Sequence, residues 1–174
     1  MKETPTPLLV IRKYGDPVLQ KKAKPVKDLA QVKELAPAMF EAMYAEPGIG
    51  LAAPQVGISL RLMVVDVATE KNQPRPMILV NPKIEEKKGT VESVEGCLSF
   101  PGVTVTISRA ERVRVSALNE HGFPVTVQAD GLLSRCLQHE MDHLDGVLMI
   151  DHLPAMEKFK VQMEIRKLKK SGQW

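Results

Sequence analysis

Residues 136–147, CLQHEMDHLDGV, place two histidines and a glutamate inside a strongly apolar stretch. His139 and His143 are four residues apart. On a helix they therefore point the same way, stacked about 6 Å from each other along the axis. Glu140 is turned about 100° away from His139, so it reaches a water on a metal ion without binding the ion itself. This H-E-x-x-H arrangement is typical of hydrolytic metal sites.

The neighbours of these polar residues predict a helix that is buried nearly all round. Asp130 is the expected N-cap and Gly146 closes the segment. Most of the helix circumference between them is apolar, through Leu132, Leu133, Cys136, Leu137, Met141 and Leu144. A buried Glu140 is costly without a charge partner, which a metal cation supplies. Two histidines hydrogen-bonded in the core are the alternative interpretation.

A catalytic metal site needs a third protein ligand and one open position. Downstream, Asp151 and His152 are candidates, although His152 lacks the glycine-spaced continuation of the metzincins. Upstream, Cys97 is flanked by glycine and polar residues, which favours an exposed thiolate ligand. Cys136 has apolar helical neighbours and is predicted to be a buried residue.

The rest of the chain predicts an α+β fold, because strand-like segments are bracketed by helices and do not alternate with them. Antiparallel sheets are expected to pack around the central metal-binding helix. An N-terminal helix is expected from Asp28 to Pro47-Gly48, with a kink or a later start at Pro37, and a C-terminal helix over 154–170. Strands are predicted at 8–11, 60–67, 77–80, 83–87, 90–94, 103–107, 112–118 and 123–129.

The chain of 174 residues fits one domain, 1–174, with 1–7 as a loose tail. Its net charge of +3 is mild and gives no reason to expect specific DNA binding. No apolar run reaches membrane-spanning length, and the first residues resemble neither a secretory signal nor a transit peptide. We therefore expect a cytoplasmic protein, in which a disulfide between Cys97 and Cys136 is disfavoured.

Three stretches of the chain resemble the peptide deformylase family, in the family's order. They are Gly48-Ile-Gly-Leu-Ala-Ala-Pro-Gln55, Glu95-Gly-Cys-Leu-Ser99 and Gln138-His-Glu-Met-Asp-His143. The similarity extends over about residues 8–170, and the helical C-terminus resembles the first of the family's two main types. The resemblance implies a hydrolase that removes formate from N-formylmethionyl nascent peptides.

The resemblance also implies the metal site and its supporting groups. Cys97, His139 and His143 would bind one Fe(2+) ion, for which Zn(2+), Ni(2+) or Co(2+) can substitute. Glu140 would act as general acid and base. The Gln55 side-chain amide and the Leu98 backbone N–H would stabilise the oxyanion. A Glu95–Arg109 salt bridge is expected to brace the Cys97 loop.

The substrate pocket is partly derived from helical spacing. Leu132, Cys136, His139 and His143 form one stripe, so an apolar floor that suits methionine runs away from the metal. Ile49 is expected to supply a wall, and the Gly50 backbone to approach the substrate. An alternative is that Leu132 and Cys136 are only core residues. The segment 102–106 has no basic residue where many relatives carry an arginine near the substrate.

Two other functions compete with this one. A generic metallopeptidase would explain His139, Glu140 and His143, but neither Cys97 nor Gln55. A metal-stabilised binding module would have a closed four-ligand site and no use for Glu140. The helix at 154–170 carries six basic residues against two acidic ones, which predicts either a solvated face or docking on the ribosome near the peptide exit.

Overall fold

The computed structural model describes residues 8–68 and 73–174, so the tail expected at residues 1–7 lies outside the described part. The described residues form an α+β fold with antiparallel sheets, as expected. The helices are α1 (Leu29–Ala45), α2 (Gly131–Leu144) and α3 (Ala155–Lys170). The strands are β1 (Gly50–Ala52), β2 (Leu62–Asp66), β3 (Pro76–Lys88), β4 (Val91–Cys97), β5 (Phe100–Arg109), β6 (Arg112–Leu118) and β7 (Pro124–Ala129).

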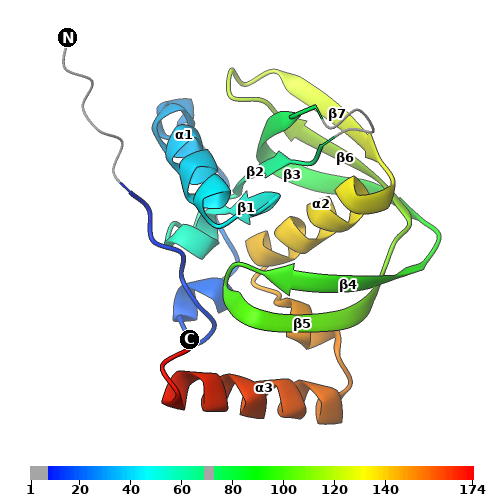
Figure 1. The fold of residues 1–174 in the computed structure, drawn as a ribbon. Coiled ribbons are helices and arrows are strands. Elements are labelled where there is room, and N and C mark those ends of the chain that lie inside the picture. The colour runs from blue at the N-terminus through cyan, green and yellow to red at the C-terminus, as the bar shows by residue number, and fades with distance from the viewer. Residues whose placement is uncertain (1–7, 69–72) are drawn as a thin grey trace.

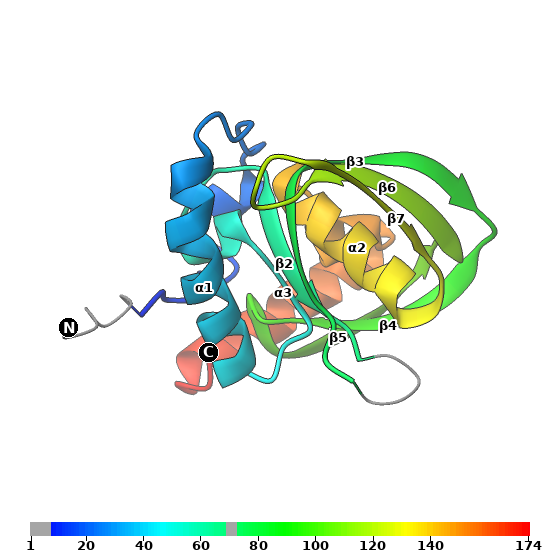
Figure 2. The ribbon, with the colours of Figure 1, turned by 90° about the horizontal axis from the view of Figure 1, so that it is seen from above.

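Helix α2 lies at the centre of the molecule, between two sheets (Figure 1). One sheet has five strands in the order β1-β2-β3-β6-β7, and the other is the hairpin β4-β5. Seen from above, β3, β6 and β7 curve around α2 while β4 passes on its other side (Figure 2). The expected arrangement of sheets around a central helix is therefore confirmed.

The apolar run in β2 packs against two helices at once. Side chains of a strand alternate between its faces. Met63 and Val65 join the cluster of buried residues around α2, whereas Leu62 and Val64 join the cluster beneath α1. All four are fully buried. The strand therefore holds α1 and α2 on opposite faces of the five-stranded sheet.

Helix α1 begins as predicted but is not interrupted. The Asp28 carboxylate accepts a hydrogen bond from the Ala30 N–H, which caps the first turn. The helix runs from Leu29 through Pro37 to Ala45, so the expectation of a later start is wrong. Buried Val32, Ala36, Met39 and Met43 hold both halves of the helix against one core cluster.

Two strand predictions are corrected. Residues 8–11 form no strand: Leu8 and Val10 are exposed while Leu9 and Ile11 pack on the α1 cluster, but the segment has no partner strand. Residues 77–80 and 83–87 belong to one strand, β3, which continues through irregular pairing after Val80. Asn81 lies there at φ 49°, and its side chain exchanges two hydrogen bonds with the Val26 backbone.

The two remaining helices differ from expectation in detail. Asp130 is the N-cap of α2, but its side chain makes no capping hydrogen bond. Helix α3 packs on the β4-β5 side through Val161, Ile165 and Leu168. The apolar residues Met156, Phe159 and Met163 of the same helix are exposed, so its apolar side chains do not all face inward. None of the helices described is long and apolar enough to cross a bilayer.

Candidate metal centre

The central helix brings the H-E-x-x-H residues into a site enclosed by both sheets. His139, Glu140 and His143 are all buried, because α2 has the five-stranded sheet on one side and the hairpin on the other. The two imidazole rings lie with their centroids 5.0 Å apart. The rings meet edge to face, and the distance is that expected of residues one helical turn apart.

Cys97 completes a group of three donors. It is the last residue of β4, directly before the turn at Leu98-Ser99, and this turn directs its side chain towards α2. The donor atoms of Cys97, His139 and His143 all lie within 4.8 Å of one another. Cys97 Sγ is 3.3 Å from His143 Nε2. One thiolate and two imidazoles suit a tetrahedral ion that keeps one position open.

Glu95 fixes the orientation of His139. The His139 Nδ1 atom is hydrogen-bonded to Glu95 Oε1 at 2.8 Å, which leaves Nε2 free to bind a metal. Arg109 donates to both oxygens of Glu95 at 2.8 Å, so the expected salt bridge is confirmed. Burial opposes ionisation of Glu95, but the hydrogen bonds from Arg109 and His139 hold its pKa well below its usual value. Glu95 is therefore a charged anchor for the imidazole.

His143 has the protonation state that a ligand needs. Burial lowers the pKa of His143 well below its usual value, and the neighbouring His139 lowers it further. The ring is therefore neutral near pH 7 and has a lone pair to donate. The donor types, their convergence and the charged anchor on His139 together fit a bound metal ion.

The two downstream candidates for a third ligand lie outside this group. His152 Nε2 is 2.7 Å from Asp142 Oδ2, and Asp142 in turn accepts a hydrogen bond from Arg109 at 2.6 Å. Asp151 accepts hydrogen bonds from the Leu148 N–H and from Lys158. His152 and Asp151 are committed to these contacts and are not among the convergent donors.

Glu140 is buried beside the donors but is not one of them. Its Oε2 atom has no hydrogen-bond partner among the described residues. Burial raises the pKa of Glu140 to about 7, although the charge of His139 works in the opposite direction. A carboxyl group with this pKa both accepts and returns a proton near neutral pH.

Gln55 is held with its amide NH₂ group towards the thiolate. The Gln55 Oε1 atom accepts a hydrogen bond from the Ala52 N–H at 2.9 Å, which fixes which end of the amide faces the site. The Nε2 atom is 3.5 Å from Cys97 Sγ and 3.3 Å from Ser99 Oγ. The short helix η2 (Ala53–Val56) that carries Gln55 begins immediately after β1. The donor is therefore positioned by fixed backbone elements.

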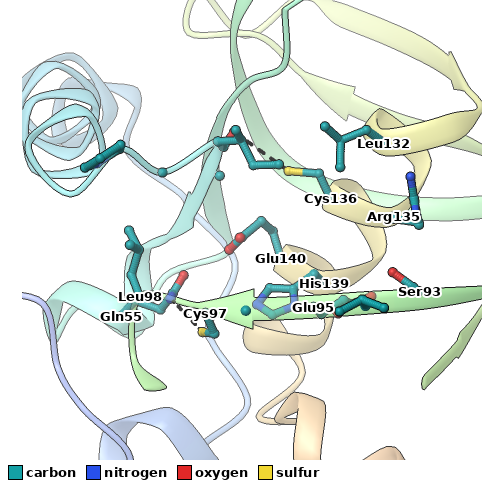
Figure 3. A pocket seen from close by; sticks show the side chains of 16 residues that line it. Gln55, Ser93, Glu95, Cys97, Leu98, Leu132, Arg135, Cys136, His139 and Glu140 are labelled. Atoms are coloured by element: carbon teal, nitrogen blue, oxygen red, sulfur yellow. Dashed lines mark hydrogen bonds and ion pairs between the residues drawn. The ribbon is translucent and has the colours of Figure 1, made fainter. Parts of the chain in front are cut away.

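A pocket opens from these groups along α2 (Figure 3). All four residues expected to contact substrate line it, namely Ile49, Gly50, Leu132 and Cys136. Cys136 is buried, as predicted, whereas Leu132 is 48% exposed and forms part of the rim. Gln55, Leu98 and Glu140 line the same pocket, so the reacting groups and the apolar floor share one space.

The sequence patterns did not identify Asp142 or Arg135. Asp142 links Arg109 to His152. A charged residue on a buried helix indicates an oppositely charged partner, so the position of Asp142 in the H-E-x-x-H segment was a signal in the sequence. Arg135 lines the pocket. It lies one helical turn before His139, a spacing that was available in the sequence.

Known proteins resemble this chain over nearly its whole length. The sequence profile of the family described as Polypeptide deformylase matches residues 8–159. A peptide deformylase from Acidobacterium capsulatum is 45% identical over 165 residues, covering 94% of this chain and 97% of the relative.

Solved structures give the same result. The crystal structure of a peptide deformylase from Legionella pneumophila has a TM-score of 0.88 and 40% identity, covering 95% of this chain and 98% of that one. A peptide deformylase from Synechococcus elongatus, solved in complex with actinonin, has a TM-score of 0.83 and 42% identity, covering 99% of this chain and 90% of that one. Profile, identity and fold agree over nearly the full length, and the chain belongs to the polypeptide deformylase family.

Proposed function

We propose that this chain hydrolyses the formyl group from the N-terminal formylmethionine of newly synthesised polypeptides, giving formate and a free amine. One observation carries the proposal: Glu140 is buried, has an unpartnered oxygen, and lies beside the convergent donors Cys97, His139 and His143. Family membership supplies the substrate class and the dependence on a metal.

The reaction follows from the positions of these residues. Cys97, His139 and His143 would hold the metal ion, which would supply a Lewis acid for the formyl oxygen and would lower the pKa of water towards about 7. Glu140 takes the proton from the attacking water. It then delivers that proton to the nitrogen as the carbon–nitrogen bond breaks.

Two donors are proposed to stabilise the negative charge that develops on the formyl oxygen. The Gln55 amide is already oriented into the site by the Ala52 N–H. The Leu98 backbone lies in the turn that follows Cys97. Removing one such donor typically costs about 3 kcal/mol of transition-state stabilisation.

The pocket along α2 is proposed to hold the methionine side chain. Leu132, Cys136 and Ile49 provide apolar surface there. Gly50 lets strand β1 lie close to helix α2, because a Cβ atom at this position would lie 2.7 Å from Cys136 Sγ. An unbranched thioether adapts well to an irregular apolar pocket of this kind.

We propose Fe(2+) as the resident ion, with Zn(2+), Ni(2+) or Co(2+) able to replace it. The proposal rests on the family resemblance, since one thiolate and two imidazoles suit several of these ions. Elemental analysis of protein purified without oxygen tests it. Iron close to one atom per chain supports the assignment, and zinc at that level in the same preparation contradicts it.

Release of formate from formyl-Met-Ala-Ser tests the proposed reaction. A generic metallopeptidase would instead cut an internal bond and leave the formyl group in place. A metal-stabilised binding module would do neither. Chromatography of the products, together with a formate assay, separates the three functions, and an absence of formate from metal-loaded protein contradicts our proposal.

We also propose that α3 docks on the ribosome near the peptide exit. The enzyme would then act in the cytoplasm. Its residues 1–174 are proposed to form one catalytic domain. Exposed Met156, Phe159 and Met163 lie on the same helix as its lysines and are available for contact. Ribosomal RNA attracts such cations with a strong dependence on salt. The substrate chains emerge at the same place.

Charge reversal at selected lysines tests docking without disturbing the fold. Lys158 is paired with Asp151, and Lys169 contacts the Tyr14 carbonyl and the Trp174 ring, so both are left unchanged. Lys160, Lys167 and Lys170 are exposed and suit replacement by Glu. The triple variant should lose co-sedimentation with ribosomes at low salt while hydrolysing the free tripeptide normally. Unchanged co-sedimentation would leave α3 as a structural element only.

A further inference from the structure

Arg135 occupies an unusual place for an arginine. It is on α2, one turn before His139, and lines the same pocket as Leu132, Cys136 and Glu140. Figure 3 shows it beside Leu132 and above Ser93, on the side of the pocket bordered by β4. Its side chain is partly buried.

Among the described residues, Arg135 differs from the other arginines that are shielded from solvent. Arg61 pairs with Asp145 at 2.9 Å, and Arg109 pairs with Glu95 at 2.8 Å. Arg135 forms no ion pair and no hydrogen bond in the described part of the chain, and its Nε atom is buried without a partner. Withdrawing a guanidinium from water without a partner is unfavourable.

The acidic residues near Arg135 do not supply that partner. Asp130 and Glu111 border a neighbouring surface hollow that Arg135 also lines, yet neither forms an ion pair with it. Inside the pocket, Glu95 is committed to Arg109 and His139. Arg135 therefore presents an uncompensated positive charge to whatever enters the pocket.

The proposed function puts the formylated peptide in this pocket, and the role inferred for Arg135 rests on that function. The formyl carbon must lie beside Glu140 and the three donors. Arg135 precedes His139 by one turn, about 6 Å along the helix axis. An extended peptide advances about 3.3 Å per residue. The residues that directly follow formylmethionine therefore come within reach of a long arginine side chain.

We propose that Arg135 is a specificity-determining residue that binds a carboxylate side chain at the second or third position of the formylated peptide. Guanidinium and carboxylate form paired, charge-assisted hydrogen bonds, which are stronger than neutral ones. The enzyme consequently favours nascent chains that carry aspartate or glutamate at one of the two positions after formylmethionine.

Amidated peptides test this preference, since the side chain is then their only carboxylate. We compare formyl-Met-Glu-Ala-amide and formyl-Met-Ala-Glu-amide with formyl-Met-Ala-Ala-amide and formyl-Met-Lys-Ala-amide. One of the two acidic peptides should have a kcat/KM about five- to tenfold above that of the neutral one, the size expected of a partly solvated charged hydrogen bond. Raising the salt concentration should reduce this ratio.

Three variants identify the residue responsible. Arg135→Met keeps the aliphatic stem and should bring the acidic-to-neutral ratio to about one. Arg135→Glu should reverse the preference, so that the acidic peptide favoured by the parent becomes a poorer substrate than the neutral one. Arg112→Met is the matched control, because Arg112 borders the outer hollow but not the substrate pocket, and it should leave the ratio unchanged.

The outcomes separate this inference from the proposed function. If the parent enzyme shows no preference for either acidic peptide, or if the preference survives in Arg135→Met, the role of Arg135 is refuted. If the parent releases no formate even from the neutral peptide, the proposed function itself fails. Should Arg135→Met not fold, Arg135→Glu decides the point, since a preference for the acidic peptide that survives in this variant refutes the role of Arg135.

Discussion

At the scale of single residues, the centre contains two buried glutamates with opposite properties. Glu95 accepts hydrogen bonds from Arg109 and His139, which hold its pKa well below the usual value, so it remains charged and anchors an imidazole. Glu140 has an unpartnered oxygen, and burial raises its pKa to about 7. Two carboxyl groups in different environments thereby take different roles, one positioning and one transferring protons.

Replacing Glu140 by Ala or by Gln is expected to abolish turnover while preserving fold and metal. Loss of a general base typically lowers kcat about 10²–10⁴-fold. The donors do not include Glu140, so metal content per chain should be that of the parent. Gln keeps the volume of the side chain and controls for the space that Ala leaves. Turnover near the parent value in either metal-loaded variant, measured with saturating formyl-peptide, would exclude Glu140 as the base.

The shared face of His139 and His143 could be predicted from the sequence because that information is local. The spacing of His139 and His143 on one helix determines that they share a face, and the glycine-flanked Cys97 was distinguishable from Cys136. Contacts between distant segments carry no such local signal. The hydrogen bonds from Asp142 to Arg109 and His152 depend on how β5 and the end of α2 meet, which only the folded chain reveals.

At the scale of elements, β1 and α2 are in very close contact. A Cβ atom on Gly50 would lie 2.7 Å from Cys136 Sγ and 2.9 Å from Glu140 Oε1. Gly50→Ala is therefore expected to displace Glu140 and to lower both kcat and the melting temperature. Gly96→Ala is the matched control, because the nearest atom to a Cβ there is 3.8 Å away. Equal activity of the two variants would show that β1 adjusts without moving the catalytic carboxyl group.

Strand β1 also illustrates a limit of sequence patterns for elements. Its three residues, Gly50, Leu51 and Ala52, are all buried, so they show no alternation of polar and apolar side chains, and no strand was predicted there. Strand β6 was predicted with its observed ends, because Val113, Val115 and Ala117 are buried on one face while Arg112 and Arg114 are exposed. Periodicity identifies an element that is half buried and is silent about one that is buried on every side.

At the scale of the whole molecule, the metal centre joins the β4-β5 hairpin to the central helix α2. Cys97 ends a strand of the hairpin, and His143 lies 46 residues later on the central helix. A bound ion would therefore link the hairpin to α2, two parts of the fold that β6 and β7 separate along the chain. Because the three donors converge only in the folded state, metal binding stabilises that state.

Removing the metal is accordingly expected to lower the melting temperature of the whole domain. Free metal at about 1,000 times its dissociation constant adds about 4 kcal/mol to the free energy of unfolding. For a chain of 174 residues this corresponds to roughly 10 °C. Calorimetry with and without zinc, which does not undergo redox chemistry, measures the increment.

The two cysteines provide the variants that locate this effect. Cys97→Ala should abolish the zinc-dependent increment together with metal content, since it removes one of the three donors. Cys136→Ala removes a buried side chain of the α2 core and should lower the melting temperature of the metal-free protein while keeping the increment. Equal increments in the two variants would mean that Cys97 is not a ligand, and that the hairpin is held on α2 by Glu95 and Arg109 alone.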